Sequence, residues 1–142
     1  MVSTVAVGTD GSQTASEALE MAVDLARRFD SKLVLLSAFQ ESGGRARQAT
    51  GPSREIDWAV SSSAQVREIL ARAEADLLRQ GIDCTTSIDE GEPGDVLVRL
   101  ATECGADLLV IGNKGMHRRV LGSVPNTVTH KAPCSVLVVK TA

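Results

Sequence analysis

Short apolar runs alternate with longer amphipathic segments along the chain. Four of the five runs are almost continuously apolar, as is typical of strands buried on both faces of a parallel sheet. The third run is polar, which favours a place at an edge of that sheet. The predicted strands are residues Thr4–Gly8, Lys32–Phe39, 83–88, 107–111 and 135–139.

Between the runs, apolar residues recur at the spacing of one helix face. Gly81 and Gly105 follow the second and third of these segments, where a glycine commonly ends a helix, and Pro93 stands near the start of the third. A fourth, short helix is predicted from near Ser123 to just before Pro133. The apolar faces of the first three predicted helices are Ala15, Ala18, Leu19, Ala22, Ala26 and Phe29, then Val66, Ile69, Leu70, Ala73 and Leu77, then Val96, Leu97, Leu100, Ala101 and Cys104.

The strict alternation of strand and helix indicates an α/β fold. We expect an open five-stranded parallel sheet with helices on both faces, in one domain over residues 1–142. Ligands of such sheets bind beyond the carboxyl ends of the strands, where the strand order reverses. These ends are predicted at residues 8–11, at 38–40 and from Gly112 onward, and residues 40–57 are predicted to form a long mobile loop.

Composition and charge argue against a nucleic-acid or membrane partner. Two Phe, one Trp and no Tyr make the core aliphatic and leave few aromatic faces on which bases could stack. The net charge is −3, and no block of Lys and Arg offers a footprint for DNA or RNA. No apolar stretch approaches the length of a membrane span, and the N-terminus lacks a targeting pattern. Cys84, Cys104 and Cys134 have no CxxC spacing and are expected to be reduced, partly buried thiols of a cytoplasmic protein.

The segment from residue 112 to 126 carries the strongest chemical signal. Gly112 and Gly115 would let the backbone turn tightly and approach a ligand closely. Gly122 and Ser123 open the last predicted helix, whose first N–H groups, positive dipole end and Ser123 hydroxyl suit phosphate oxygens. Positive charge beside them comes from Lys114, Arg118 and Arg119.

A plainer interpretation of this segment stays open. It could be a simple strand-to-helix connection in which Ser123 caps the helix. Neither GxxxxGK[ST] nor GxGxxG occurs, so the glycines do not form one of these phosphate-binding motifs.

Four stretches of sequence together resemble the universal stress protein family along essentially the whole chain. They are VGTDGS at 7–12, GADLLVIG at 105–112, GSV at 122–124 and APCSVLVV at 132–139. The resemblance implies an adenine nucleotide alpha-hydrolase-like (Rossmann-like) sheet with strand order 3-2-1-4-5. It also implies a stress-response role with ATP, or alternatively AMP or cyclic AMP, as ligand, and with Mg²⁺ as a companion of the phosphates.

The ATP-binding members of the family carry G-x2-G-x9-G-[S/T]. Here Gly112 and Gly115 match the first pair, and Gly122 with Ser123 match the end. Only six residues separate Gly115 from Gly122, where the family pattern has nine. The shorter loop has less chain to wrap around a triphosphate, and we expect it to favour AMP or cyclic AMP.

The resemblance also assigns individual contacts. Gly8, Thr9 and Asp10 would lie against the adenosine, and the Asp10 carboxylate would accept hydrogen bonds from it. Ala38 would offer its backbone to the adenine edge. The ribose and phosphates would be surrounded by Ile111, Gly112, Asn113, Lys114, Gly115, Met116, Arg118, Gly122, Ser123 and Val124.

Asp10 has a second interpretation, because Asp-Gly-Ser is also good turn chemistry and the carboxylate could serve the turn alone. A response-regulator receiver has the same alternation and a lysine after its last strand, as Lys140 is here. Such a receiver needs an acidic pair after strand one to hold Mg²⁺, and only Asp10 stands there. His117 and His130 have no Cys or carboxylate at metal-ligand spacing, so no protein metal site is predicted.

Three functions therefore compete. The first is a regulatory nucleotide-binding protein without an assigned catalytic residue. The second is a slow ATPase or nucleotidyl-transfer enzyme, in which Asp10 or a loop residue would orient water or a metal. The third is an interaction module without a ligand, against which Gly112, Gly115, Gly122 and Ser123 speak.

The last predicted strand has no helix after it. As an edge strand it would expose unpaired N–H and C=O groups, which pairing with a second copy would satisfy. The resemblance implies the same arrangement, so we expect a homodimer through Val136, Leu137, Val138 and Val139.

Overall fold

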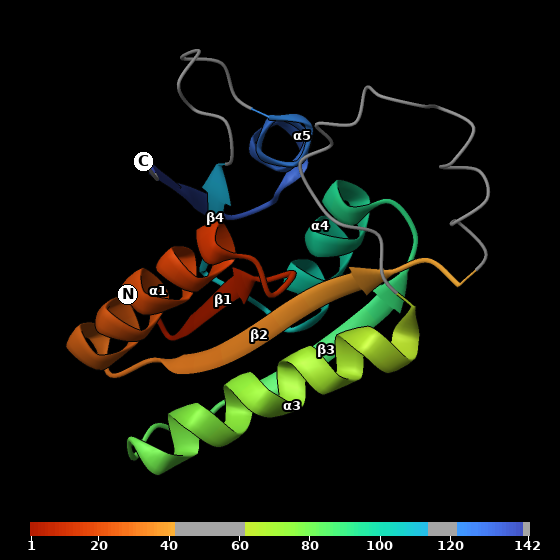
Figure 1. The fold of residues 1–142 in the computed structure, drawn as a ribbon. Coiled ribbons are helices and arrows are strands. Elements are labelled where there is room, and N and C mark those ends of the chain that lie inside the picture. The colour runs from red at the N-terminus through yellow and green to blue at the C-terminus, as the bar shows by residue number, and fades with distance from the viewer. Residues whose placement is uncertain (42–61, 114–121, 141–142) are drawn as a thin grey trace.

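The computed structural model describes residues 1–41, 62–113 and 122–140, and within them the backbone forms one parallel sheet (Figure 1). The strand order is β3-β2-β1-β4-β5, as the family resemblance implied. The order reverses between β1 and β4, so ligands are expected at the carboxyl end of this pair. The strands are β1 (Thr4–Gly8), β2 (Lys32–Phe39), β3 (Thr85–Glu90), β4 (Leu108–Asn113) and β5 (Ser135–Lys140).

Three strands, β3, β4 and β5, differ from their predicted bounds because backbone pairing, rather than apolar content, sets their ends. β3 starts at Thr85, not at residue 83, because the Ile82 N–H still bonds to Leu77 in the turn after the preceding helix. β4 continues through Gly112 and Asn113, which pair with Val139 and Lys140 of β5. The prediction that strand four ends before Gly112 was therefore wrong. The polar β3 does lie at an edge, as expected.

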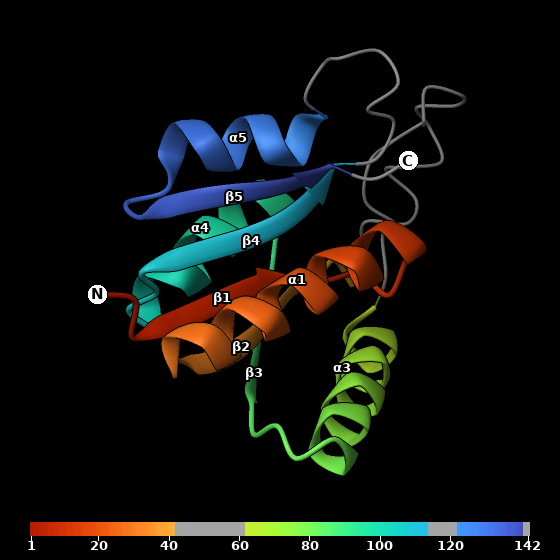
Figure 2. The same ribbon diagram turned by 90° about the vertical axis from the view of Figure 1, so that its left-hand side faces the viewer.

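Helices cover both faces of the sheet (Figure 2). Helices α1 and α3 pack on one face with Val5, Leu35 and their neighbours, and α4 and α5 pack on the other with Ala6, Leu36 and theirs. The two buried clusters are aliphatic, as the composition required. The described helices are α1 (Gln13–Phe29), α3 (Ser63–Arg79), α4 (Pro93–Glu103) and α5 (Ser123–Lys131).

The helix ends follow the expected local chemistry. The Ser12 hydroxyl caps α1 by accepting a hydrogen bond from the Ala15 N–H at 3.1 Å. Gly81 and Gly105 adopt φ values of +80° and +69° just beyond α3 and α4, where an L side chain would be strained. Phe29 was predicted to face the core but is 46 % exposed, because it is the last residue of α1 and lies beyond Ala26, the last buried residue of that helix.

Cys84, Cys104 and Cys134 are free and half-buried, each packed against one of the two cores. None of the described helices combines the length and apolar character that crossing a bilayer requires. The residues predicted to form a mobile loop lie, from residue 42 onward, outside the described part of the chain.

Candidate functional site

The carboxyl end of β1 contacts helix α4 on one face and strand β2 at its edge. A Cβ on Gly8 would come within 2.9 Å of the Leu97 Cδ1 atom, so a larger residue here would force the Leu97 side chain of α4 to shift. The Thr9 N–H donates to the Leu36 carbonyl at 3.0 Å, and the buried Ser37 hydroxyl donates to the Thr9 carbonyl at 2.6 Å. Thr9 is consequently held against β2.

The Asp10 carboxylate orders the turn that follows. Its Oδ1 atom accepts a hydrogen bond from the Ser12 N–H at 2.9 Å, and the Thr9 hydroxyl accepts one from the Gly11 N–H at 3.2 Å. Gly11 has φ +82°, which explains the glycine. The turn-forming role of Asp10 is thus confirmed, whereas its contact with adenosine stays a prediction.

Beyond Leu36, β2 leaves its pairing with β1. The β1–β2 register ends at Gly8 and Leu36, while the β2–β3 register continues through Ala38 and Phe39. Near Ala38, the edge of β2 that faces β1 is therefore not paired with β1. This is the point where adenine was expected. The Ala38 side chain itself is buried with the α4–α5 core, so only its backbone could face a ligand.

The ends of β4 and α5 are tied together by one buried side chain. Asn113 is completely buried, and its Oδ1 atom accepts a hydrogen bond from the Gly122 N–H at 2.9 Å. Asn113 was predicted from the sequence to contact the ligand alone. Its position shows a structural role as well, because it places the start of α5 beside the end of β4.

The first turn of α5 points its amides toward this edge of the sheet. Gly122 is the cap residue, with extended backbone, and Ser123 is the first helical residue, so the interpretation of Ser123 as the cap was wrong. Pro125 carries no N–H, which leaves Ser123 and Val124 as the backbone donors of the turn. Together with the positive end of the helix dipole they can receive an anion.

Two of the residues predicted to contact the ligand can do so only through their backbone. The side chains of Ile111 and Val124 lie in the core under α4 and α5, where they are 0 % and 5 % exposed. Lys114, Gly115, Met116 and Arg118 were also predicted to contact the ligand, and they lie outside the described residues, as do Arg119 and His117. At the carboxyl edge the structure collects the remaining predicted residues: Gly8, Thr9, Asp10, Ala38, Gly112, Asn113, Gly122 and Ser123.

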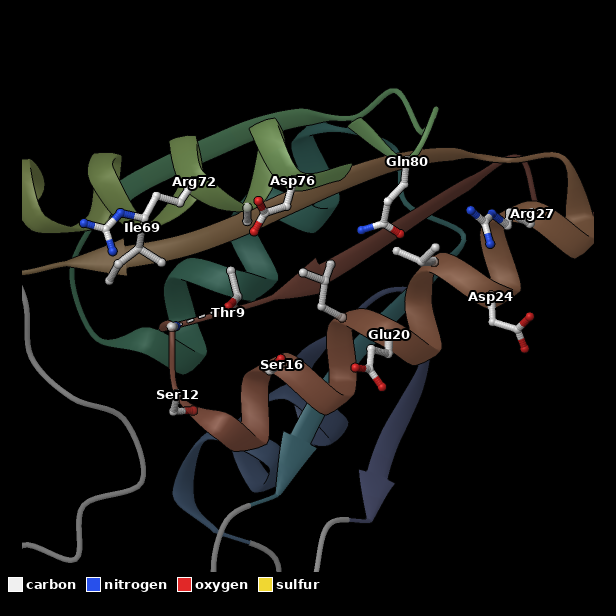
Figure 3. A pocket seen from close by; sticks show the side chains of 14 residues that line it. Thr9, Ser12, Ser16, Glu20, Asp24, Arg27, Ile69, Arg72, Asp76 and Gln80 are labelled. Carbon is white, nitrogen blue, oxygen red and sulfur yellow. Dashed lines mark hydrogen bonds between the residues drawn. The ribbon is translucent and has the colours of Figure 1, made fainter. Parts of the chain in front are cut away.

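A groove of about 650 Å³ runs between α1 and α3 (Figure 3). Its wall includes the apolar Leu19 and Ile69, and its rim carries charged groups such as Glu20 and Asp76. It shares Thr9 with the candidate site but otherwise lies on the α1–α3 face, opposite α5. The groove therefore does not contain the predicted phosphate contacts.

Three hydrogen bonds that shape this edge were not predicted from the sequence. Ser37, a polar residue inside an apolar run, holds Thr9, and this interruption of the run was the available signal. The Gln40 amide donates to the Gly91 carbonyl at 3.1 Å, and the Gly91 N–H donates to the Phe39 carbonyl at 3.0 Å. These bonds fix the β3–α4 turn to the end of β2, and no local sequence pattern predicts them.

The described residues contain no group of three His, Cys, Asp or Glu side chains that could hold a metal ion. His130 lies in the last turn of α5, with its Nδ1 atom 2.8 Å from the Asn126 carbonyl oxygen. This contact with the carbonyl one turn earlier in the same helix gives His130 a structural explanation.

Comparison with known proteins identifies relatives over the whole fold. The model of the universal stress protein family matches residues 1–140. The universal stress protein Rv1636 of Mycobacterium tuberculosis strain H37Rv is 38 % identical over 145 residues, which cover 97 % of this chain and 96 % of that protein.

Solved structures agree with this match. A crystal structure of a universal stress protein in complex with cAMP has 35 % identity and a TM-score of 0.68, covering 99 % of this chain and 98 % of that one. A member from Burkholderia pseudomallei has 28 % identity and a TM-score of 0.67, covering 97 % and 96 %. With a family match over nearly its full length, this chain belongs to the universal stress protein family.

Proposed function

We propose that this universal stress protein binds an adenine nucleotide at the carboxyl edge of its sheet. The phosphate would lie on the first turn of α5, and the adenosine would lie against Thr9, Asp10 and the backbone of Ala38. The observation that carries the proposal is the 2.9 Å bond from the Gly122 N–H to Asn113 Oδ1, which sets the α5 amides at the end of β4. The relative solved with cAMP, which this chain matches over 99 % of its length, supports the same ligand class.

The first turn of α5 is suited to one phosphate group. Two backbone donors, at Ser123 and Val124, match a single phosphate better than a chain of three. The glycine loop points the same way, since six residues rather than nine separate Gly115 from Gly122. We therefore propose AMP or cyclic AMP as the preferred ligand over ATP. With ATP, Mg²⁺ would enter bound to the phosphates rather than in a site of protein ligands.

We propose a regulatory binding role in the stress response rather than turnover. The Asp10 Oδ1 atom is engaged with the Ser12 N–H, which ties the carboxylate to the turn rather than to an attacking water. The three free thiols fit a reducing compartment, and we place the protein in the cytoplasm.

We also propose a homodimer through β5. This strand lies at the edge of the sheet, next to β4 on one side only. Pairing with β5 of a second copy would continue the sheet and satisfy the outward N–H and C=O groups. Light scattering at micromolar concentration should give twice the chain mass, and a monomer mass would contradict the dimer.

A competition titration tests the ligand. Calorimetry with ATP, ADP, AMP and cyclic AMP should give the tightest binding for a nucleotide with one phosphate group. Gly122→Asp should abolish binding without unfolding α5, because Asp is a favourable cap residue but repels phosphate there. Ser62→Asp, at the cap of α3, is the matched control. Undiminished nucleotide binding by a folded Gly122→Asp protein would refute the proposal.

A further inference from the structure

We propose that Lys140, the last residue of β5, is a phosphate-binding residue of the candidate site and makes the site prefer AMP, with its doubly charged phosphate, to cyclic AMP. The inference rests on the proposed function, because it adds a contact to the same site. Nothing near Lys140 in the sequence resembles the glycine loop, so only the sheet pairing brings it to this edge.

The register of β4 and β5 determines where Lys140 lies. Its Cα atom is paired with that of Asn113 at the carboxyl end of the sheet. Neighbouring strands are about 4.8 Å apart, so the lysine backbone lies directly beside the asparagine. Asn113 in turn accepts the hydrogen bond from Gly122, the cap of α5. Lys140 is thus one strand away from the residue that holds the helix end.

Side-chain alternation places the lysine on the same face of the sheet as α5. Along β5, Leu137 and Val139 pack with the α1–α3 core, whereas Val136 and Val138 pack with the α4–α5 core. Successive strand residues point to opposite faces, so Lys140 follows Val136 and Val138 toward α5. Asn113 points to this face too, as its bond to Gly122 requires.

The lysine is able to take an anion. Lys140 is exposed, and it forms no ion pair with any carboxylate in the described ranges. Its ammonium group carries three donors on a flexible four-carbon stem, which lets it follow a phosphate oxygen at the start of α5. The amides of α5 fix the position of the phosphate, and the lysine adds a full positive charge beside them.

The charge of the ligand should decide how much Lys140 contributes. AMP carries close to two negative charges at neutral pH, cyclic AMP carries one, and adenosine carries none. A lysine beside the phosphate therefore stabilises AMP most and adenosine not at all. The contribution of a partly solvated ion pair corresponds to about fivefold in Kd at low salt, and salt screens it.

The experiment compares the parent chain with Lys140→Gln, using AMP, cyclic AMP and adenosine in calorimetry at low and high salt. We expect Lys140→Gln to weaken AMP binding about fivefold at low salt. Cyclic AMP should weaken less and adenosine not at all, with the AMP effect shrinking at high salt. Lys140→Arg should restore AMP affinity. Lys32→Gln is the matched control, since Lys32 is an exposed lysine at the opposite end of its strand and of the sheet.

The outcomes separate this inference from the proposed function. If the parent chain binds none of the three ligands, the proposed function fails and the role of Lys140 falls with it. If the parent binds AMP and Lys140→Gln binds it as tightly, only the role of Lys140 is overturned. An equal loss for AMP and adenosine would also overturn it, because that pattern reports a structural defect rather than a phosphate contact.

Discussion

Asn113 Oδ1 accepts a hydrogen bond from the Gly122 N–H at 2.9 Å, and the asparagine is completely buried. This bond joins the last residue of β4 to the cap of α5, and so it sets the separation between the switch point of the sheet and the helix end. The candidate phosphate site exists only while that separation is kept.

Replacing Asn113 with Ala should therefore lower both stability and nucleotide affinity. The Gly122 N–H, which is partly buried, would lose its acceptor, and the loss of such a hydrogen bond costs about 0.5–1.5 kcal/mol. Urea unfolding measures the first effect and calorimetry with AMP the second. Asn126→Ala, an exposed asparagine of the same helix, is the control for stability and should change it little. Unchanged stability of Asn113→Ala would mean that the bond does not hold α5 in place.

A second position controls where α5 lies. A Cβ on Gly94 of α4 would come within 2.8 Å of both the Thr127 Cβ and Cγ2 atoms of α5. Because one clash is with Cβ itself, no rotation of the Thr127 side chain relieves it, and the helices must separate. Gly94→Ala should cost about 1–3 kcal/mol, as overpacking does.

The same substitution should weaken nucleotide binding, since α5 carries the candidate donors. Gly105→Ala is the control: its φ of +69° strains an alanine, but nothing lies within 4 Å of the new Cβ, so α5 stays in place. Thermal unfolding measures the stability of both variants, and titration with AMP measures their nucleotide affinity. If Gly105→Ala reduced affinity as much as Gly94→Ala, global instability rather than helix position would explain the loss.

The fold was predictable because its signals are local. β1 and β2 are buried by helices on both faces, so their residues had to be almost continuously apolar, and their bounds matched the prediction. β3 lies at the edge of the sheet and its composition is polar. Both of its predicted bounds are two residues too early in the sequence. The bounds of such a strand depend on the strand with which it pairs, and the position of that partner cannot be inferred from the strand's own residues.

The site was predictable only in part, for the same reason. The glycines and the α5 start are local features, and the family resemblance identified them. The roles of Asn113, Ser37 and Lys140 depend on residues far away in the sequence: Asn113 on Gly122, Ser37 on Thr9, and Lys140 on the β4–β5 register. Ser37 is marked in the sequence only by its place inside an apolar run, and nothing in the neighbouring sequence distinguishes Asn113 or Lys140 from ordinary polar residues.

The thiols offer a test of burial. Burial raises the pKa of Cys104 and Cys134, and for Cys134 the neighbouring Cys104 and Asp107 raise it further. At pH 8 the folded protein should therefore hold less thiolate than the unfolded chain and react more slowly with iodoacetamide. Mass spectrometry of the alkylated peptides, with and without urea, measures both rates. Equal rates in the two states would contradict the raised pKa values.

The N-terminus should make the fold sensitive to acid through Asp107. Its Oδ2 atom accepts hydrogen bonds from the Ser3 N–H at 2.8 Å and the Thr4 N–H at 3.0 Å, and these bonds lower the pKa of the carboxyl group. A group with a lowered folded-state pKa stabilises the fold above its unfolded value of about 3.9, and this stability is lost as the pH falls through the folded-state pKa.

Asp107→Asn should accordingly lower the free energy of unfolding at pH 7. The difference in unfolding free energy between the parent and the variant should narrow as the pH falls below about 4. Urea midpoints measured from pH 7 down to pH 3 give that margin directly. Asp83→Asn, which removes an exposed carboxylate just before β3, serves as the control for the change in net charge. A margin that stayed constant over the acid range would show that the carboxylate charge does not fasten the start of β1.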